Sequence, residues 1–340
     1  MTTISSISEL LTLSNCQFRI YDIGRKIDKL SKETFNKIEL NQLPFPSPSQ
    51  GNAQLAIAFW QKQSQHPYLW FVKLPLDERG LLNQGARNHF VAIIAEALGA
   101  DLSVDPTEKQ AELLKSNPYI FTPSQYKLAM INSLLSFDLK RPVSQYYSTF
   151  TMYLEQENWQ KWQDIGVQGI TDFVARLDDK AQNELLANAI SHLPFEVLSP
   201  LCGALENTTL AYCVIESILN LLVDLPVNEI EKKQMLVRCL ASSISHPLVQ
   251  DYFEELLCAS SLETDLLICI SGRCWAVLTD EIRLMKYLEL LVQKNNTELF
   301  NAVFKDLVAI PTVRPLLFKC IRQTNRSEAL SMAIGQLFKS

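Results

Sequence analysis

The sequence predicts an α+β protein that is predominantly helical. It should contain a small antiparallel sheet with a helix at the N-terminus, followed by a HEAT-like stack of helix hairpins. Apolar residues tend to alternate before about residue 75, and they recur every three or four positions afterwards. Only 10 of 340 residues are glycine, against an average of about 7%, which favours helices joined by short connections. We expect an α+β domain over 1–100 and an all-helical domain over 101–340, with a globular helical bundle as the alternative to the stack.

Three segments of the N-terminal region have the alternation of β-strands. They begin at Phe18, at Leu55 and at Tyr68. A fourth strand is predicted over 34–40, because Ile38 and Leu40 share a parity. The segment 68–74 is apolar on both parities except at Lys73, which is typical of a central strand.

The connections favour antiparallel pairing. The short link QKQSQH at 61–66 fits a hairpin better than a helical crossover. The segment PFPSPSQG at 44–51 is rich in proline and is predicted to be a loop.

A helix is predicted from about 78 to 98, with Asp77 as its N-cap. A short amphipathic helix is expected at the N-terminus. Further helices are predicted at 107–116, 122–137, 143–156, 167–176 and 179–191.

From about 193 onward, a proline repeatedly opens an amphipathic helix, and a second helix follows. The openings are 193–205, 246–257 and 310–321, and the partner helices include 208–223, 281–293 and 326–338. Each helix pair has one apolar face that only a neighbouring pair can bury, so a HEAT-like stack is the preferred interpretation.

The net charge of −6 is unevenly distributed. Residues 151–310 carry 11 Lys and Arg against 23 Asp and Glu, whereas residues 311–340 carry 5 against 1. Such an acidic body repels phosphate, which makes nucleic acid an unlikely partner. The basic C-terminal helices leave nucleic-acid binding as a third hypothesis.

The chain is expected to be cytoplasmic. Its N-terminus lacks the basic residues and the clean apolar run of a secretory signal, and no window has the roughly 18 uninterrupted apolar residues of a membrane span. Under those conditions the eight cysteines are expected to be free thiols, most of them buried.

Motifs for common chemistries are missing from the sequence. It has no glycine-rich phosphate loop, nucleophile elbow, zinc-protease helix or calcium loop, so no cofactor is expected. Its four histidines are isolated and no C-x-x-C occurs, so no metal site is expected. On a continuous helix, Cys269 and Cys274 would lie about 140° apart and would not share a face.

One constellation of charged residues could have a role in ligand binding or catalysis. Its members flank the first and last predicted strands and the following helix, and they are Tyr21, Asp22, Arg25, Lys73, Asp77 and Arg87. If the strands pair, these residues could gather near one edge of the sheet as a binding site. The favoured interpretation is structural, with Lys73 lying along the sheet, Asp77 capping a helix and ion pairs fixing the fold.

Two segments that contain these residues also carry a family resemblance. The segments CQFRIYDIGRKI at 16–27 and HPYLWFVKLPLDERGLL at 66–82, with PFPSPSQ between them, resemble a family of uncharacterised bacterial proteins of about 340 residues. The resemblance implies a bacterial cytoplasmic protein with a domain of unknown function, and it brings no established site residues.

We expect a non-enzymatic interaction or scaffold protein that presents an acidic helical surface to a protein partner. The alternative is a small-molecule-binding or enzymatic site in the N-terminal region, built from the charged constellation.

Overall fold

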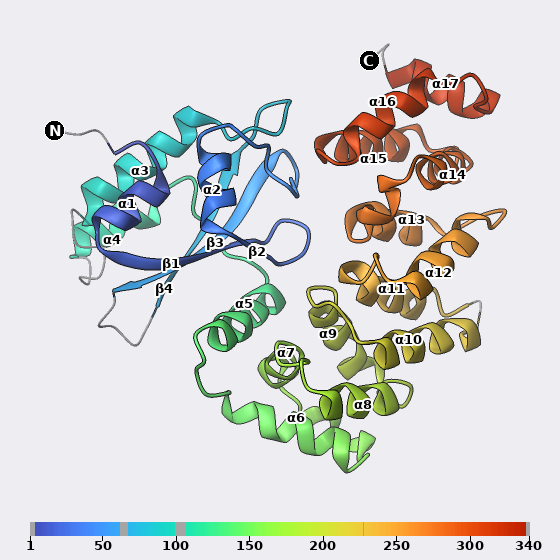
Figure 1. Cartoon of the computed structure of the whole chain (residues 1–340), viewed down its shortest axis with the longest axis horizontal. Helices are drawn as coiled ribbons and strands as arrows, with labels where there is room; N and C mark the ends of the chain where they lie inside the picture. Colours follow the sequence, from blue (N-terminus) through green and yellow to red (C-terminus); the bar gives the residue numbers. More distant parts are fainter. Residues whose placement is uncertain (1–3, 62–66, 99–106, 227, 338–340) are drawn as a thin grey trace. The chain divides into compact units, whose positions relative to one another are not determined.

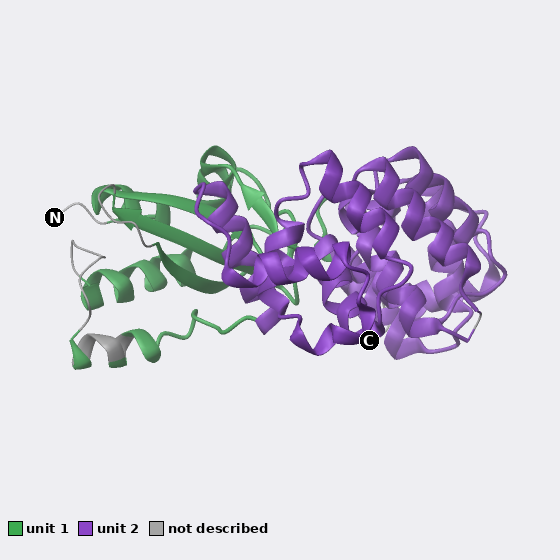
Figure 2. Ribbon diagram, turned by 90° about the horizontal axis from the view of Figure 1, so that it is seen from below, with its two compact units in different colours: residues 1–124, 309–311 green, residues 125–308, 312–340 purple. Residues whose placement is uncertain are grey.

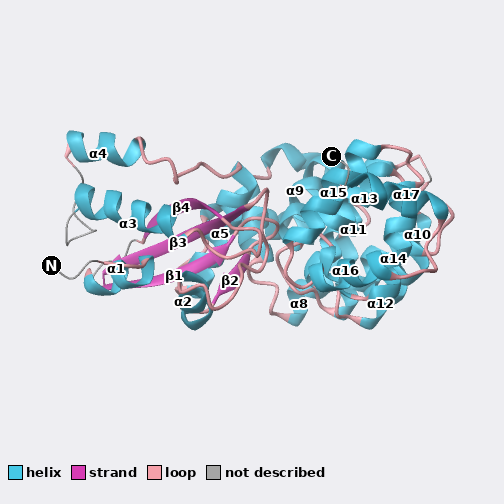
Figure 3. Ribbon diagram, turned by 90° about the horizontal axis from the view of Figure 1, so that it is seen from above, coloured by secondary structure: helices cyan, strands magenta, loops and turns pink. Residues whose placement is uncertain are grey.

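The computed structural model describes residues 4–61, 67–98, 107–226 and 228–337 (Figure 1). The chain forms two compact units, residues 1–124 with 309–311 and residues 125–308 with 312–340, which Figure 2 colours separately. The domain boundary predicted at 100/101 lies outside the described residues. An N-terminal sheet followed by many helices confirms the α+β, mostly helical class (Figure 3).

The sheet has four strands, all antiparallel to their neighbours. They are β1 (Cys16–Asp22), β2 (Asp28–Leu30), β3 (Asn52–Gln61) and β4 (Tyr68–Pro75), in the order β2-β1-β3-β4. Ile57 of β3 lies opposite Ile20 of β1 and Trp70 of β4. The three strands predicted with clear alternation are therefore confirmed, and β2 is a short strand that the sequence did not indicate.

The central-strand prediction for 68–74 is wrong, because β4 ends the strand order and β3 is central. The outer edge of β4 is nevertheless paired. The amide of Lys73 donates to the carbonyl of Tyr119 at 2.7 Å, and the amide of Phe121 donates to the carbonyl of Phe71 at 3.1 Å. Residues 119–121 thus pair with this edge, and the ring of Phe121 also contacts Phe71, which is on the opposite parity from the buried Val72 and Leu74.

The strand predicted over 34–40 is also wrong. This segment is helix α2 (Lys32–Glu39), and the hydroxyl of Ser31 caps it by accepting a hydrogen bond from the amide of Thr34 at 3.0 Å. Phe35 and Ile38 are both buried, and a spacing of three residues places them on one helix face. The capping serine and this spacing outweigh the shared parity of Ile38 and Leu40.

Helix α3 (Gln84–Leu98) begins later than predicted, and Asp77 does not cap it. The Oδ1 atom of Asp77 accepts hydrogen bonds from the amides of Arg79 and Leu81, so this aspartate closes a turn before the helix. The side chain of Asn83 accepts from the amide of Ala86 at the true start.

The core of the first unit lies between one face of the sheet and helices α1 (Ile7–Leu13), α2 and α3. Buried side chains that point from the sheet into this layer include Phe18, Ile57 and Val72, and Phe90 of α3 meets them. Helix α4 (Glu108–Lys115) packs beside α3.

The rest of the chain is helical. The helices are α5 (Gln125–Asp138), α6 (Gln145–Glu155), α7 (Val167–Val174), α8 (Lys180–Ala189), α9 (Phe195–Leu205), α10 (Tyr212–Asp224), α11 (Ile230–Cys239), α12 (Pro247–Leu257), α13 (Thr264–Gly272), α14 (Glu281–Val292), α15 (Thr297–Ala309), α16 (Arg314–Arg322) and α17 (Glu328–Leu337). Short 3₁₀ segments occur at Trp159–Asp164, Leu240–Ser242 and Trp275–Thr279. The predicted helices are confirmed, and α11, α13 and α15 are additional.

Most of these helices pack against the helix two positions away in the chain. One set of contacts joins α7 to α9, α9 to α11 and α11 to α13, and another joins α8, α10, α12, α14 and α16 in turn (Figure 1). Among the described residues, no helix combines the length and the apolar character needed to cross a membrane.

Helices α6 and α7 approach each other very closely at Gly169. A Cβ atom on Gly169 would lie 2.4 Å from the carbonyl oxygen of Tyr146, a distance that no side chain tolerates. Glycine is therefore required here by packing between the two helices.

We predict that Gly169→Ala lowers the free energy of unfolding by about 1–3 kcal/mol, because the helices must separate to admit the methyl group. Gly335→Ala is the matched control: Gly335 lies in α17 with open space around it, so alanine should raise stability by about 0.5–1 kcal/mol. Urea denaturation of both variants measures the difference. Equal effects of the two substitutions would contradict the packing argument.

Candidate functional site

The first group of predicted site residues lies at the end of β1 and in the turn after it. The Oδ1 atom of Asp22 accepts a hydrogen bond from the amide of Gly24 at 2.9 Å, and Nε of Arg25 donates to the carbonyl of Pro48 at 2.8 Å. Tyr21, Asp22 and Arg25 are all buried. A Cβ atom on Gly24 would lie 2.9 Å from the carbonyl oxygen of Ser47, so this turn packs tightly on the proline-rich loop.

Lys73 and Asp77 lie at the end of β4, two strands away from Asp22 at the same end of the sheet, since Asp22 is opposite Leu55 and Leu55 is opposite Val72. Lys73 is half-buried on β4, and its amide joins the edge pairing with Tyr119. Asp77 closes its turn and forms an ion pair of 3.1 Å with Arg79, whose side chain is largely exposed.

Arg87 of α3 contacts Glu39 at the end of helix α2. Its guanidinium donates to the carbonyl of Glu39 and to the side chain of Asn88. The carboxylate of Glu39 is only 1% exposed and accepts hydrogen bonds from the amides of Ile7 at 2.7 Å and Ser8 at 3.0 Å. Burial raises the pKa of Glu39, although these hydrogen bonds and Arg87 act in the opposite direction.

The residues of the predicted constellation make contacts of several kinds. Asp22 and Arg25 hold the turn and the proline-rich loop, Asp77 holds its own turn, and Arg87 connects α3 to the end of α2. Glu39 was not among the predicted site residues. In the sequence it is only an acidic residue near the end of the segment 34–40, which was predicted to be a strand.

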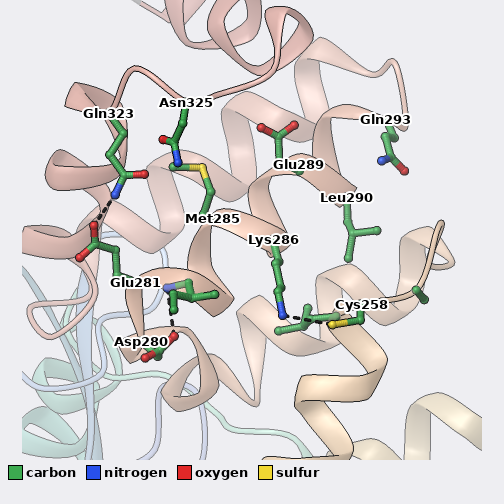
Figure 4. A pocket seen from close by; sticks show the side chains of 13 residues that line it. Cys258, Asp280, Glu281, Met285, Lys286, Glu289, Leu290, Gln293, Gln323 and Asn325 are labelled. Carbon is green, nitrogen blue, oxygen red and sulfur yellow. Dashed lines mark hydrogen bonds between the residues drawn. The ribbon is translucent and has the colours of Figure 1, made fainter.

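The helical unit contains a groove. This groove between α12, α14 and the segment after α16 has a volume of about 930 Å³ (Figure 4). It is lined by Leu257, Cys258, Ala259, Asp280, Glu281, Ile282, Met285, Lys286, Glu289, Leu290, Gln293, Gln323 and Asn325. We call it the α12–α14 groove.

The charged side chains around Lys286 form ion pairs with one another. Lys286 and Arg283 both contact the carboxylate of Glu254, Arg283 at 3.1 Å, and Nζ of Lys286 also lies 3.1 Å from the Cys258 sulfur. The hydrogen bond to Glu254 raises the pKa of Lys286, and the hydrogen bond from Lys286 lowers the pKa of Glu254.

The other carboxylates hold neighbouring elements in place. Asp280 caps α14 by accepting hydrogen bonds from the amides of Ile282 and Arg283. Glu281 contacts Lys319 and Gln323, and Glu289 accepts hydrogen bonds from the amide and hydroxyl of Ser327. Ile282, 65% exposed, leaves a large apolar side chain uncovered beside these groups.

The chain matches a known family model over almost its whole length. The family model described as "Protein of unknown function (DUF3549)" matches residues 2–338. The chain belongs to this family. Neither the curated proteins nor the solved structures contain a significant match.

In the part of this DUF3549 chain that the structure describes, no group of three or more His, Cys, Asp and Glu side chains is arranged to hold a metal ion. The arrangement in the α12–α14 groove, with capped helix ends and paired charges around apolar side chains, suits binding by shape and charge.

The raised pKa of Glu39 predicts a pH dependence of stability. The folded state holds the proton more tightly than the unfolded state, so the contribution is complete below the ordinary value of 4.5 and is lost as pH rises through the folded pKa. The free energy of unfolding of the wild type, relative to Glu39→Gln, should therefore fall as pH rises from 4.5. Urea denaturation across pH 4.5–7 measures it.

Glu33→Gln provides the control for this measurement. Glu33 is exposed on the same helix, and the hydrogen bond from Lys37 lowers its pKa, so its small contribution should be lost as pH falls. A difference for Glu39→Gln that rises with pH or stays flat would contradict the assignment.

Proposed function

We propose that this DUF3549 protein is a non-enzymatic interaction protein, and that its helical unit binds a basic, amphipathic helix of a protein partner in the α12–α14 groove. The observation that carries the proposal is the groove itself, with exposed Ile282 beside several carboxylates. Apolar surface rimmed by polar groups is typical of sites where proteins bind one another.

The helix packing supports a HEAT-like arrangement for this unit. Contacts between helices two positions apart, such as α9 with α11 and α10 with α12, are those expected when helix hairpins stack in sequence. Stacks of this kind expose grooves between successive hairpins, and such grooves commonly accept a helix or an extended peptide.

The charge of the surface favours a basic partner. Exposed carboxylates of α10 to α13 and their connections form no ion pair with other described residues; they are Asp224, Glu229, Glu231, Asp251, Glu255, Glu263 and Asp265. Together with Asp280 on the groove rim, they create a field that attracts Lys and Arg side chains.

The length of the groove fits a short helix. Helix α14 has 12 residues, and a helix of that size is about 18 Å long. An apolar stripe on the partner would contact Ile282 and Met285, and lysines or arginines on its flanks would approach Asp280 and Glu289, which line the groove.

The groove chemistry argues against catalysis as its main role. Asp280 and Glu289 accept hydrogen bonds from protein groups, and Lys286 is held in an ion pair with Glu254. A general acid or base needs a buried, perturbed group facing substrate, and these side chains lie near the surface.

We predict that a synthetic helix of about 14 residues, with leucines at helical spacing and lysines elsewhere, binds the purified protein. Ile282→Gln should weaken its binding about tenfold, because the apolar contact of a large side chain contributes roughly 1.5 kcal/mol. Met152→Gln is the matched control, since Met152 is an exposed apolar residue on α6, and it should leave the affinity unchanged. Fluorescence polarisation measures all three proteins.

Charge and location supply the further arms of this test. Binding should weaken with salt, and the same peptide with glutamate in place of lysine should not bind. A photo-crosslinker at position 282 should attach to the lysine peptide and, in cell extract, to a basic apolar segment of one protein. Equal binding of both peptides, or equal loss in both variants, would overturn the proposal.

A further inference from the structure

Four buried cysteines lie at the contacts between α9, α11 and α13. They are Cys202, Cys239, Cys269 and Cys274, and all are free thiols. Two of them, Cys269 and Cys274, are close in the chain and lie together at the end of α13. We call this pair the α13 dithiol.

The end of the helix brings the dithiol together. Because α13 ends at Gly272, Cys274 does not continue the helix, and the sequence-based argument that placed the two cysteines 140° apart fails. The amides of Arg273 and Cys274 both donate to the carbonyl of Cys269, at 2.8 and 3.3 Å.

The packing against α11 fixes both sulfur atoms in the same region. The Cys269 sulfur lies 3.7 Å from the carbonyl oxygen of Gln234, and the Cys274 sulfur lies 3.5 Å from the carbonyl oxygen of Val237. These carbonyls are three residues apart on α11, or about 4.5 Å along its axis. Both sulfur atoms therefore lie over the same turn of α11, and a hydrogen bond joins the two thiols.

The surroundings favour a thiolate at Cys269. A hydrogen bond from the Cys274 thiol lowers the pKa of Cys269, and the guanidinium groups of Arg238 and Arg273 act in the same direction. Both arginines are held there by the buried carboxylate of Glu206, Arg273 at 3.6 Å.

A second thiol pair in the same unit has the opposite character. Cys239 contacts Cys202 across α11 and α9, and burial strongly raises the pKa of Cys239. Arg238 lies near both pairs. The hydrogen bond from Cys274 is the largest cause of the lowered pKa of Cys269, and Arg273 adds to it, whereas burial dominates at Cys239. The Cys202–Cys239 pair can therefore serve as an internal control for the reactivity of the α13 dithiol.

We propose that the α13 dithiol is a redox-active site, at which hydrogen peroxide converts Cys269 and Cys274 to an intramolecular disulfide. The Cys269 thiolate attacks one peroxide oxygen, the O–O bond breaks, and the released hydroxide takes a proton to leave as water, which gives a sulfenic acid. The Cys274 sulfur then attacks the Cys269 sulfur, the S–O bond breaks, and the hydroxyl group leaves as a second water with the Cys274 proton. In total, two thiols lose two hydrogen atoms and one peroxide yields two waters.

Peroxide is the oxidant that suits this location. Cys269 is 5% exposed and Cys274 is fully buried, so a small molecule can reach the first sulfur where a folded thiol-oxidising protein cannot. The second sulfur needs no access to solvent, because its partner is already adjacent.

The test exposes the full-length protein to hydrogen peroxide, blocks remaining thiols by alkylation, and maps tryptic peptides by mass spectrometry. Trypsin cleaves after Arg273, so the disulfide would join peptide 239–273 to peptide 274–283. We expect this linked species to appear before Cys239 or Cys202 is oxidised, with the loss of two alkylatable thiols, and a reductant should restore both.

Two variants make the assignment specific. Cys274→Ser should abolish the linked species and leave a sulfenic acid at Cys269 that dimedone captures, whereas Cys202→Ser should form the link as the wild type does. The proposal is overturned if wild-type Cys269 and Cys274 stay alkylatable at a peroxide dose that oxidises the exposed Cys258, or if the disulfide joins other cysteines.

Discussion

The helical unit depends on one constraint: most of its helices pack against the helix two positions along the chain. Helices of 8 to 14 residues, such as α7 and α5, are marginal in isolation, so this packing supplies their stability. The same packing places the buried carboxylate of Glu206 beside Arg238 of α11 and Arg273 at the end of α13, whereas Gly169 is required by the close contact between the consecutive helices α6 and α7. Without those arginines the carboxylate would be too costly to bury.

The N-terminal unit is organised by β3 and by one buried acid. Central strand β3 pairs along both edges, and its apolar side chains meet three helices. Glu39 joins these helices. Its carboxylate accepts hydrogen bonds from the first amides of α1, and its backbone carbonyl accepts a hydrogen bond from the guanidinium of Arg87 on α3. The charged residues near this sheet thus have structural contacts that account for their positions. The binding groove and the redox site proposed above therefore both lie in the helical unit.

The α12–α14 groove and the α13 dithiol lie at different helix contacts of the helical unit. The α12–α14 groove is open and combines an exposed isoleucine with carboxylates, which suits a basic helix. The α13 dithiol is buried between α13 and α11, where oxidation would alter a contact in the helix packing. An interaction surface and a redox-sensitive contact can coexist in one helical stack, because each contact mainly concerns neighbouring helices.

The sequence by itself determined the class of the fold, most helix positions and three strands, because periodicity reports which faces are buried. It failed where long-range pairing decides: β4 lies at the end of the strand order although apolar residues on both parities are typical of a central strand, and 34–40 is part of a helix that Ser31 begins although Ile38 and Leu40 share a parity. The sequence also selected charged residues near the sheet, but only the tertiary structure showed that Asp77 pairs with Arg79 and that Arg87 contacts Glu39. Likewise, Cys269 and Cys274 meet because α13 ends at Gly272, and a helix end of this kind is decided by packing against α11 rather than by local spacing.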